Sequence, residues 1–130
     1  MTLLAVVVGG LLGTGLRLTL DTLLPHSDSA FPWSTLIINL VGAFVLGILV
    51  ARVWPTAPAW LKAGLGPGLI GTFTTFSALV VSLLTLTRAG MPLTALLYLL
   101  VSVVGGLLAA ALGLRLGRTS ARTPRIEADE

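Results

Sequence analysis

The centre of the third hydrophobic segment reads Gly71-Thr-Phe-Thr-Thr-Phe-Ser77. This stretch sets four hydroxyl side chains and one glycine between apolar runs that are each long enough to cross a bilayer. Polar groups at membrane depth are tolerated only where they are buried in protein or line a cavity. The stretch therefore predicts a site inside a membrane protein, and an ion is the expected cargo.

The composition is that of a membrane protein. The chain has 130 residues, of which 55% are hydrophobic and 10% are charged, and its mean hydropathy is +1.02. A soluble domain carries about 25% charged residues. A chain this short offers one domain, so a pore should need more than one copy. The absence of cysteine excludes disulfides, thiolate metal sites and cysteine nucleophiles.

The distribution of charge limits the cargo. No carboxylate occurs from residue 29 to residue 126. Proton-coupled carriers hold Asp or Glu within the membrane and cation pores use acidic rings, so a path for an anion or a neutral molecule remains. The basic residues stand singly at the ends of the apolar segments, apart from a cluster near the carboxyl end. They predict membrane anchors and no nucleic-acid surface.

Four segments are long and apolar enough to cross a bilayer as helices, which takes about 20 residues each. The predicted spans run near Leu3–Leu24, Ser34–Val53, Leu61–Thr87 and Pro92–Leu116. The sequence thus predicts an all-α membrane protein, with a channel domain over residues 1–118 and a disordered polar tail over residues 119–130. Small residues recur at four-residue spacing, as at Gly9 and Gly13, which indicates close helix packing and oligomerisation.

The first half of the third span contains several residues that weaken a helix. They are Gly64, Gly66, Pro67, Gly68 and Gly71. One interpretation is a helix broken mid-membrane, which frees backbone carbonyls and amides to hold an ion. The other is a continuous helix whose hydroxyls bond back to the preceding turn. Phe76 follows the hydroxyls and either presents its positive ring edge to an anion or packs against lipid or the core.

Polar side chains in the other spans are further candidates for this site. Asn39, midway through the second span, can donate to an anion or form an interhelical hydrogen bond. Tyr98 and Ser102 lie one turn apart in the fourth span, so they share a face and either donate to a ligand or are satisfied by packing. Arg17 is the one charge well inside a span. It either reaches back to a headgroup or draws anions into a vestibule.

These residues resemble those of the CrcB/Fluc fluoride channels over nearly all four spans, roughly residues 5–115. The resemblance rests on the motifs Gly9-Gly-x-x-Gly13-x-x-x-Arg17, Asn39-x-x-Gly42, Gly68-x-x-Gly71-x-x-Thr74-Thr-Phe-Ser77 and Tyr98-x-x-x-Ser102. The Thr-Thr-Phe-Ser run with its upstream glycines is the most specific of them. The resemblance implies passive export of fluoride that entered the cell as HF.

The resemblance also implies a structure and a set of site residues. Subunits of four helices, with the third helix broken mid-membrane, would pair antiparallel and enclose two narrow fluoride paths. The implied pore-lining residues are Asn39, Phe76, Ser77, Tyr98 and Ser102. A central sodium ion (Na+) would be held by the backbone carbonyls of Gly71 and Thr74 from both subunits.

The chain departs from the family pattern directly after this run. The family continues Thr-Thr-Phe-Ser with Thr-Phe, whereas this chain continues with Ala78 and Leu79. A neighbouring hydroxyl and the second phenylalanine of the family's aromatic box are missing, and Leu79 cannot supply a polarised ring edge. Either the chain tolerates this change, or it completes a path only with a different partner.

Basic residues are unequally divided between the two sides of the membrane. Four spans put both termini on one side, which carries Arg52, Lys62, Arg115, Arg118, Arg122 and Arg125. The other side carries Arg88, and also Arg17 if this residue within the first span is counted with the flanking charges. This bias predicts a fixed orientation in the cytoplasmic (inner) membrane with cytoplasmic termini. Since an antiparallel homodimer needs both orientations, the bias and Leu79 motivate a heterodimer with an oppositely oriented homologue as the alternative to a homodimer.

Two other functions fit the length and the four spans. A small multidrug exporter centres on a glutamate in its first span, but the only acid of this span is Asp21, near its end. A non-transporting accessory subunit explains the small-residue packing but not the hydroxyl-rich stretch. No acid–base pair or nucleophile with a base is visible, so an enzyme is not expected.

Overall fold

The computed structural model of the chain describes residues 1–24 and 31–119, and within these ranges it contains helices and turns but no strand. Four stretches of it have the length and composition to cross a membrane. They run over Thr2–Leu23, Trp33–Val53, Ala59–Arg88 and Pro92–Thr119. The prediction of an all-α chain with four spans is confirmed, and the fourth span ends at Thr119 instead of Leu116. The rest of the predicted tail lies outside the described residues.

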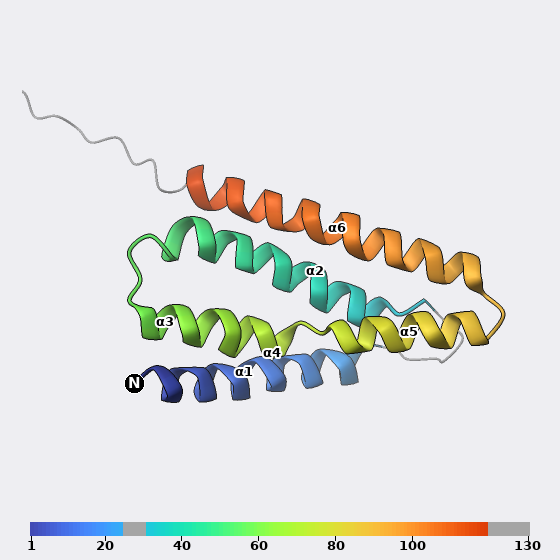
Figure 1. Cartoon of the computed structure of the whole chain (residues 1–130), viewed down its shortest axis with the longest axis horizontal. Helices are drawn as coiled ribbons and strands as arrows, with labels where there is room; N and C mark the ends of the chain where they lie inside the picture. The colour runs from blue at the N-terminus through green and yellow to red at the C-terminus, as the bar shows by residue number, and fades with distance from the viewer. Residues whose placement is uncertain (25–30, 120–130) are drawn as a thin grey trace, which may run out of the picture.

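The spans are built from α-helical and π-helical elements (Figure 1). The first, second and fourth spans consist of α1 (Thr2–Leu23), α2 (Trp33–Ile48) with π-helical η1 (Leu49–Val53), and α6 (Pro92–Thr119). The third consists of α3 (Ala59–Ala63), π-helical η2 (Gly64–Ile70), α4 (Gly71–Phe73) and α5 (Phe76–Arg88).

The helices lie side by side and alternate in direction along the chain (Figure 1). α6 packs along α2, and α1 packs along the first half of the third span, from α3 to α4. α5 packs against α6. The amino terminus and the end of α6 lie at the same end of the bundle, which the prediction of four spans requires.

Glycines allow α2 and α6 to touch through their backbones. A Cβ at Gly47 would overlap the Ala110 carbonyl oxygen, and a Cβ at Gly113 would overlap the Phe44 carbonyl oxygen. Any larger residue at these two positions would force the helices apart. The small-residue spacing in these helices therefore serves packing within the chain.

Glycines join α1 to the third span in the same way. A Cβ at Gly9 would overlap the Gly64 carbonyl oxygen. A Cβ at Gly13 would overlap both the Leu69 carbonyl oxygen and the Thr72 hydroxyl. Because the contacting atoms of α1 and of the third span are mainly backbone atoms, this contact fixes the position of α1 along the axes of η2 and α4.

A wide helical turn precedes the hydroxyl-rich stretch. At the end of η2 the Gly71 N–H donates to the carbonyl of Gly66, five residues back, whereas an α-helix would use the residue four back. Pro67 lies inside η2 and has no N–H, which removes one helical donor and favours an irregular turn. The glycines and the proline thus produce a π-helical segment directly before α4.

In the third span α4 ends at Phe73 and α5 begins at Phe76, and the last helical bond of α4 runs from the Thr74 N–H to the Ile70 carbonyl at 2.9 Å. Between the two helices, Thr74 (φ −77°, ψ 157°) and Thr75 (φ −147°, ψ 123°) are extended, and they are called the extended pair below. The Thr75 hydroxyl accepts a hydrogen bond from the Ala78 N–H at 3.2 Å and so caps α5. Such a cap stabilises a helix by about 0.5–2 kcal/mol.

A small apolar cluster lies where α2, α5 and α6 meet. Its buried members are Leu36, Leu79, Leu86, Ala95 and Tyr98. Elsewhere many large apolar side chains of α1, α5 and α6 face outward. Outward-facing apolar side chains are expected on helices that are surrounded by lipid or by another membrane subunit.

We expect Gly113→Ala to separate α2 from α6, because the added methyl would overlap the Phe44 carbonyl oxygen. Overpacking of this kind destabilises a protein by about 1–3 kcal/mol. Thermal unfolding of the purified protein in detergent measures the effect. Gly106→Ala in the same helix is the control, since a Cβ there meets nothing within 4 Å. Equal melting temperatures for the two variants would contradict this packing.

Candidate functional site

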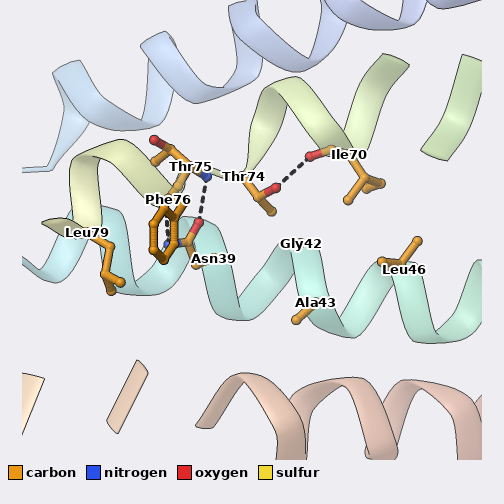
Figure 2. Close-up of a pocket in the computed structure, with 9 residues that line it drawn as sticks. All are labelled: Asn39, Gly42, Ala43, Leu46, Ile70, Thr74, Thr75, Phe76 and Leu79. Atoms are coloured by element: carbon orange, nitrogen blue, oxygen red, sulfur yellow. Dashed lines mark hydrogen bonds between the residues drawn. The ribbon is translucent and has the colours of Figure 1, made fainter. Parts of the chain in front are cut away.

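An open groove of about 330 Å³ lies between α2 and the third span, beside the extended pair (Figure 2). It is lined by Asn39, Gly42, Ala43, Leu46, Ile70, Thr74, Thr75, Phe76 and Leu79. One amide, two threonines and one aromatic ring are thus set among small and apolar side chains. None of the lining side chains is charged.

Asn39 makes two hydrogen bonds with the backbone of Thr75 (Figure 2). Its Nδ2 donates to the Thr75 carbonyl at 2.9 Å, and the Thr75 N–H donates to its Oδ1 at 2.8 Å. A buried backbone group without a partner costs about 1–3 kcal/mol, and Asn39 satisfies both groups of this extended residue. The interhelical role considered for Asn39 is therefore present, while the second N–H of its amide takes no part in these bonds.

The bonds around the extended pair redirect two backbone donors. In a continuous helix the Thr75 N–H would donate to the Gly71 carbonyl, and the Ala78 N–H would donate to the Thr74 carbonyl. Here the Thr75 N–H donates to Asn39, and the Ala78 N–H donates to the Thr75 hydroxyl. The carbonyl oxygens of Gly71 and Thr74 thus lose their helical donors, and these are the two oxygens that the family resemblance assigns to a cation.

The predicted pore residues of this stretch have different surroundings. Phe76 lines the groove and is 76% exposed, so its own chain gives the ring little cover. Ser77 is exposed, lies outside the groove lining, and has its Oγ 3.2 Å from the Thr75 Oγ1. The Thr74 hydroxyl donates back to the Ile70 carbonyl at 2.9 Å, as in a back-bonded helix.

Tyr98 lies in the core, apart from the groove, and Ser102 lies one turn further along α6 with its hydroxyl oxygen buried. The side chain of Tyr98 is 0% exposed, and within the described part of the chain neither its hydroxyl nor that of Ser102 has a hydrogen-bond partner. The hydroxyls of Thr35 and Ser82 lie beside that of Tyr98 without meeting hydrogen-bond geometry. The Phe31 ring packs at right angles to the Tyr98 ring, with centroids 5.4 Å apart.

The residues Thr35, Ser82, Tyr98 and Ser102 are called the hydroxyl cluster below. A buried hydroxyl without a partner costs about 1–3 kcal/mol, and two such groups lie close together here. Most buried polar groups have a partner, either another protein group or an ordered water. The cluster therefore has the chemistry of a small binding site for a hydrogen-bond acceptor.

Leu79 lies between the two polar regions. It lines the groove, and it also belongs to the apolar cluster that contains Tyr98. Its side chain is buried. The family resemblance leads us to expect a second aromatic ring at this position. The chain has the aliphatic side chain of Leu79 there instead, between the groove and the hydroxyl cluster.

The structure separates some predicted residues from the site and adds others. Arg17 is half-buried on α1 and does not line the groove. Sequence reasoning missed Thr35 and Ser82. Thr35 lies four residues before Asn39, one helical turn away on the same face, and this spacing could have identified it. Ser82 has no comparable signal, because its closeness to Tyr98 depends on how α5 packs against α6.

These features define a four-span membrane protein with an uncharged groove at an interrupted third span. A family model described as CrcB-like protein, Camphor Resistance (CrcB), matches residues 4–114. The chain belongs to this family. The resemblance inferred from the motifs is therefore confirmed.

The chain is similar to several proteins that are named as channels. "Fluoride-specific ion channel FluC" of Chelativorans sp. (strain BNC1) is 40% identical over 121 residues, which cover 90% of this chain and 96% of that protein. The protein of the same name from Xylella fastidiosa (strain M23) is 42% identical over 120 residues, or 89% and 90%. "Fluoride-specific ion channel FluC 2" of Ligilactobacillus salivarius (strain UCC118) is 41% identical over 118 residues, or 89% and 84%. The family is one of ion channels and not of enzymes.

We expect Asn39→Leu to release the extended pair, because the N–H and carbonyl of Thr75 would lose both partners. Each backbone group left unpaired costs about 1–3 kcal/mol. Hydrogen exchange should become faster at the Thr75 amide, and the melting temperature should fall. Thr87→Ala, which removes an exposed hydroxyl that bonds only within its own helix, is the control. Unchanged exchange at Thr75 in the leucine variant would mean that Asn39 does not hold the pair.

Proposed function

We propose that this chain is a subunit of a fluoride-specific ion channel. Fluoride that enters a cell as HF would leave passively through it, which protects the cell against fluoride toxicity. The observation that carries the proposal is the uncharged, mainly apolar groove beside the extended pair, with the Asn39 amide and two threonines in its lining. Membership of the CrcB-like family and the names of the relatives support the same cargo.

The groove has the groups that a fluoride path needs. Fluoride is small and strongly hydrated, so a path must replace its water with hydrogen-bond donors. The second N–H of Asn39 is one such donor, and the edge of the Phe76 ring carries the positive end of its quadrupole. The chain has no carboxylate from residue 29 to residue 126 that would repel an anion at membrane depth.

The hydroxyl cluster would be a second station for the same ion. Tyr98 and Ser102 are donors without partners in the described part of the chain, and fluoride is the smallest anion that could accept from both. The route from the groove to this cluster passes Leu79, which lies against both. Because Leu79 has no ring edge, this step would depend on hydroxyls or on an aromatic ring of a second subunit.

A sodium ion bound near the extended pair is part of the proposal. The residues fit it, since the Gly71 and Thr74 carbonyls have lost their helical donors, and unwound backbone carbonyls are suitable sodium ligands. Two such oxygens per subunit would become four where two subunits meet. When bound, the ion would supply a fixed positive charge close to the groove.

A second subunit is needed to complete the path. Phe76 is largely exposed and the groove is open, so one chain alone does not enclose an ion. We propose an antiparallel dimer in the membrane, in which the partner covers the groove. The small size of the chain and its outward-facing apolar side chains support this assembly.

The charge of the bundle ends bears on which chain is the partner. The end that holds the amino terminus and the last residues of α6 carries Arg52, Lys62, Arg115 and Arg118, and the other end carries Arg88. Such a bias supports cytoplasmic termini, a fixed orientation in the cytoplasmic membrane, and a heterodimer with an oppositely oriented homologue. The numeral in the name of the Ligilactobacillus relative fits a species with more than one such chain.

Fluoride efflux from liposomes tests the function directly. We expect fluoride-selective efflux, read with a fluoride electrode against a chloride control, from this chain alone or together with a homologue of opposite charge bias. Phe76→Ile should slow it roughly threefold to tenfold, which corresponds to about 0.5–1.5 kcal/mol for a lost ring contact. Phe44→Ile, outside the groove lining, is the control. Absence of fluoride efflux in both preparations would overturn the proposal.

The cysteine-free sequence allows a clean test of orientation. Thr119→Cys and Ala89→Cys place single thiols at exposed positions at opposite ends of the bundle. A fixed orientation predicts that an impermeant maleimide labels Ala89→Cys in intact cells and labels Thr119→Cys only after permeabilisation. Similar labelling of both variants in intact cells would contradict the fixed orientation and would support an antiparallel homodimer.

A further inference from the structure

Thr72 stands between the wide turn of η2 and the extended pair, and its hydroxyl contacts another span. The Thr72 Oγ1 lies 2.8 Å from the Gly68 carbonyl oxygen and 3.3 Å from that of Leu69, both in its own span. It also lies 3.1 Å from the carbonyl oxygen of Gly10, which belongs to α1. The hydroxyl therefore joins α1 to α4 at the residue after Gly71.

The surface of α1 is shaped around this side chain. A Cβ at Gly13 would overlap the Thr72 hydroxyl. A Cβ at Gly10 would lie 3.7 Å from the Thr72 Cγ2, which is an ordinary contact. Thr72 thus fits into a gap in α1 that Gly13 leaves open, and its hydroxyl lies close to the Gly10 carbonyl there.

Other threonines of the third span do not make this kind of contact. The Thr74 hydroxyl donates to the Ile70 carbonyl, and the Thr87 hydroxyl donates to the Leu83 carbonyl at 2.7 Å. Both bonds stay within one span and follow the common back-bonding pattern. Thr72 also has such a back-bond, at 2.8 Å to the Gly68 carbonyl, but its single O–H is shared with the Gly10 carbonyl of α1 at 3.1 Å, and this second acceptor distinguishes it from Thr74 and Thr87.

The interrupted region is therefore held from two sides. Asn39 of α2 binds the backbone of Thr75 on one side, and α1 binds the hydroxyl of Thr72 on the other. Gly71 precedes Thr72 directly, and the orientation of its carbonyl follows the backbone between these two attachments. Glycine has no side chain that could fix this orientation by itself.

We propose that Thr72 is a positioning residue, whose hydroxyl, through the Gly10 carbonyl of α1, orients the Gly71 and Thr74 carbonyls toward a bound sodium ion. The inference rests on the sodium site of the proposed function and adds α1 to the structure that builds it. Thr72→Val keeps the branched shape and removes the donor, whereas Thr72→Ser keeps the donor.

Sodium-dependent hydrogen exchange tests the proposal without any fluoride measurement. The full chain is purified in detergent, and exchange at the Thr74 and Thr75 amides is followed while sodium replaces N-methylglucamine. Binding of an ion to the ordered form protects these amides. We expect Thr72→Val to raise the half-protecting sodium concentration about fivefold, the effect of losing one hydrogen bond of average strength.

The matched variants separate positioning from general loss of stability. Thr72→Ser should keep the wild-type sodium concentration, and Thr87→Val should do so as well, since it loses only a bond within its own helix. The inference would be overturned if the half-protecting sodium concentration rose equally in Thr87→Val or stayed unchanged in Thr72→Val. It would also be overturned if sodium did not protect the wild-type amides. Failure of the wild-type chain to pass fluoride would instead overturn the proposed function, and the exchange data would still decide the role of Thr72.

Discussion

The pair of hydrogen bonds between the Asn39 amide and the Thr75 backbone is the interaction on which the rest of the site depends. An extended residue inside an apolar bundle is costly unless its N–H and carbonyl both find partners. Asn39 meets both needs with one side chain, and the helix can then stop and restart within two residues. The carbonyls of Gly71 and Thr74 lose their helical donors as a direct consequence.

Glycine packing determines where this interaction lies. α1 fits against η2 and α4, and α2 fits against α6, through contacts between backbones that leave no space for a Cβ. Because these distances are set by backbone atoms, the elements around the extended pair have little freedom to shift. Beside these elements Phe76 is exposed and the groove is open. The exposed Phe76 and the open groove form the face that a second subunit would cover in the proposed dimer.

The polar groups fall into two regions with different needs. In the groove the N–H and carbonyl of Thr75 are satisfied by Asn39, and an amide N–H and a ring remain for a ligand. In the hydroxyl cluster Tyr98 and Ser102 are buried without partners in the described part of the chain. Leu79 lies between the two regions. A hydrated anion that moves between the two regions would exchange water for protein hydrogen-bond donors in each of them. Leu79, which has neither a donor nor a ring edge, would stabilise the anion least along this route.

The sequence by itself determined the four spans, because the bilayer demands long apolar segments and leaves a clear pattern along the chain. It also determined the absence of carboxylates at depth and the Thr-Thr-Phe-Ser run that identifies the family. It could not show that Asn39 bonds across helices, that Thr35 and Ser82 lie beside Tyr98, or that the Thr72 hydroxyl contacts α1. These contacts were decided by the tertiary structure, for a physical reason. Helical periodicity shows which residues share a face, whereas a partner on another helix depends on the height and rotation at which glycine contacts fix the two backbones.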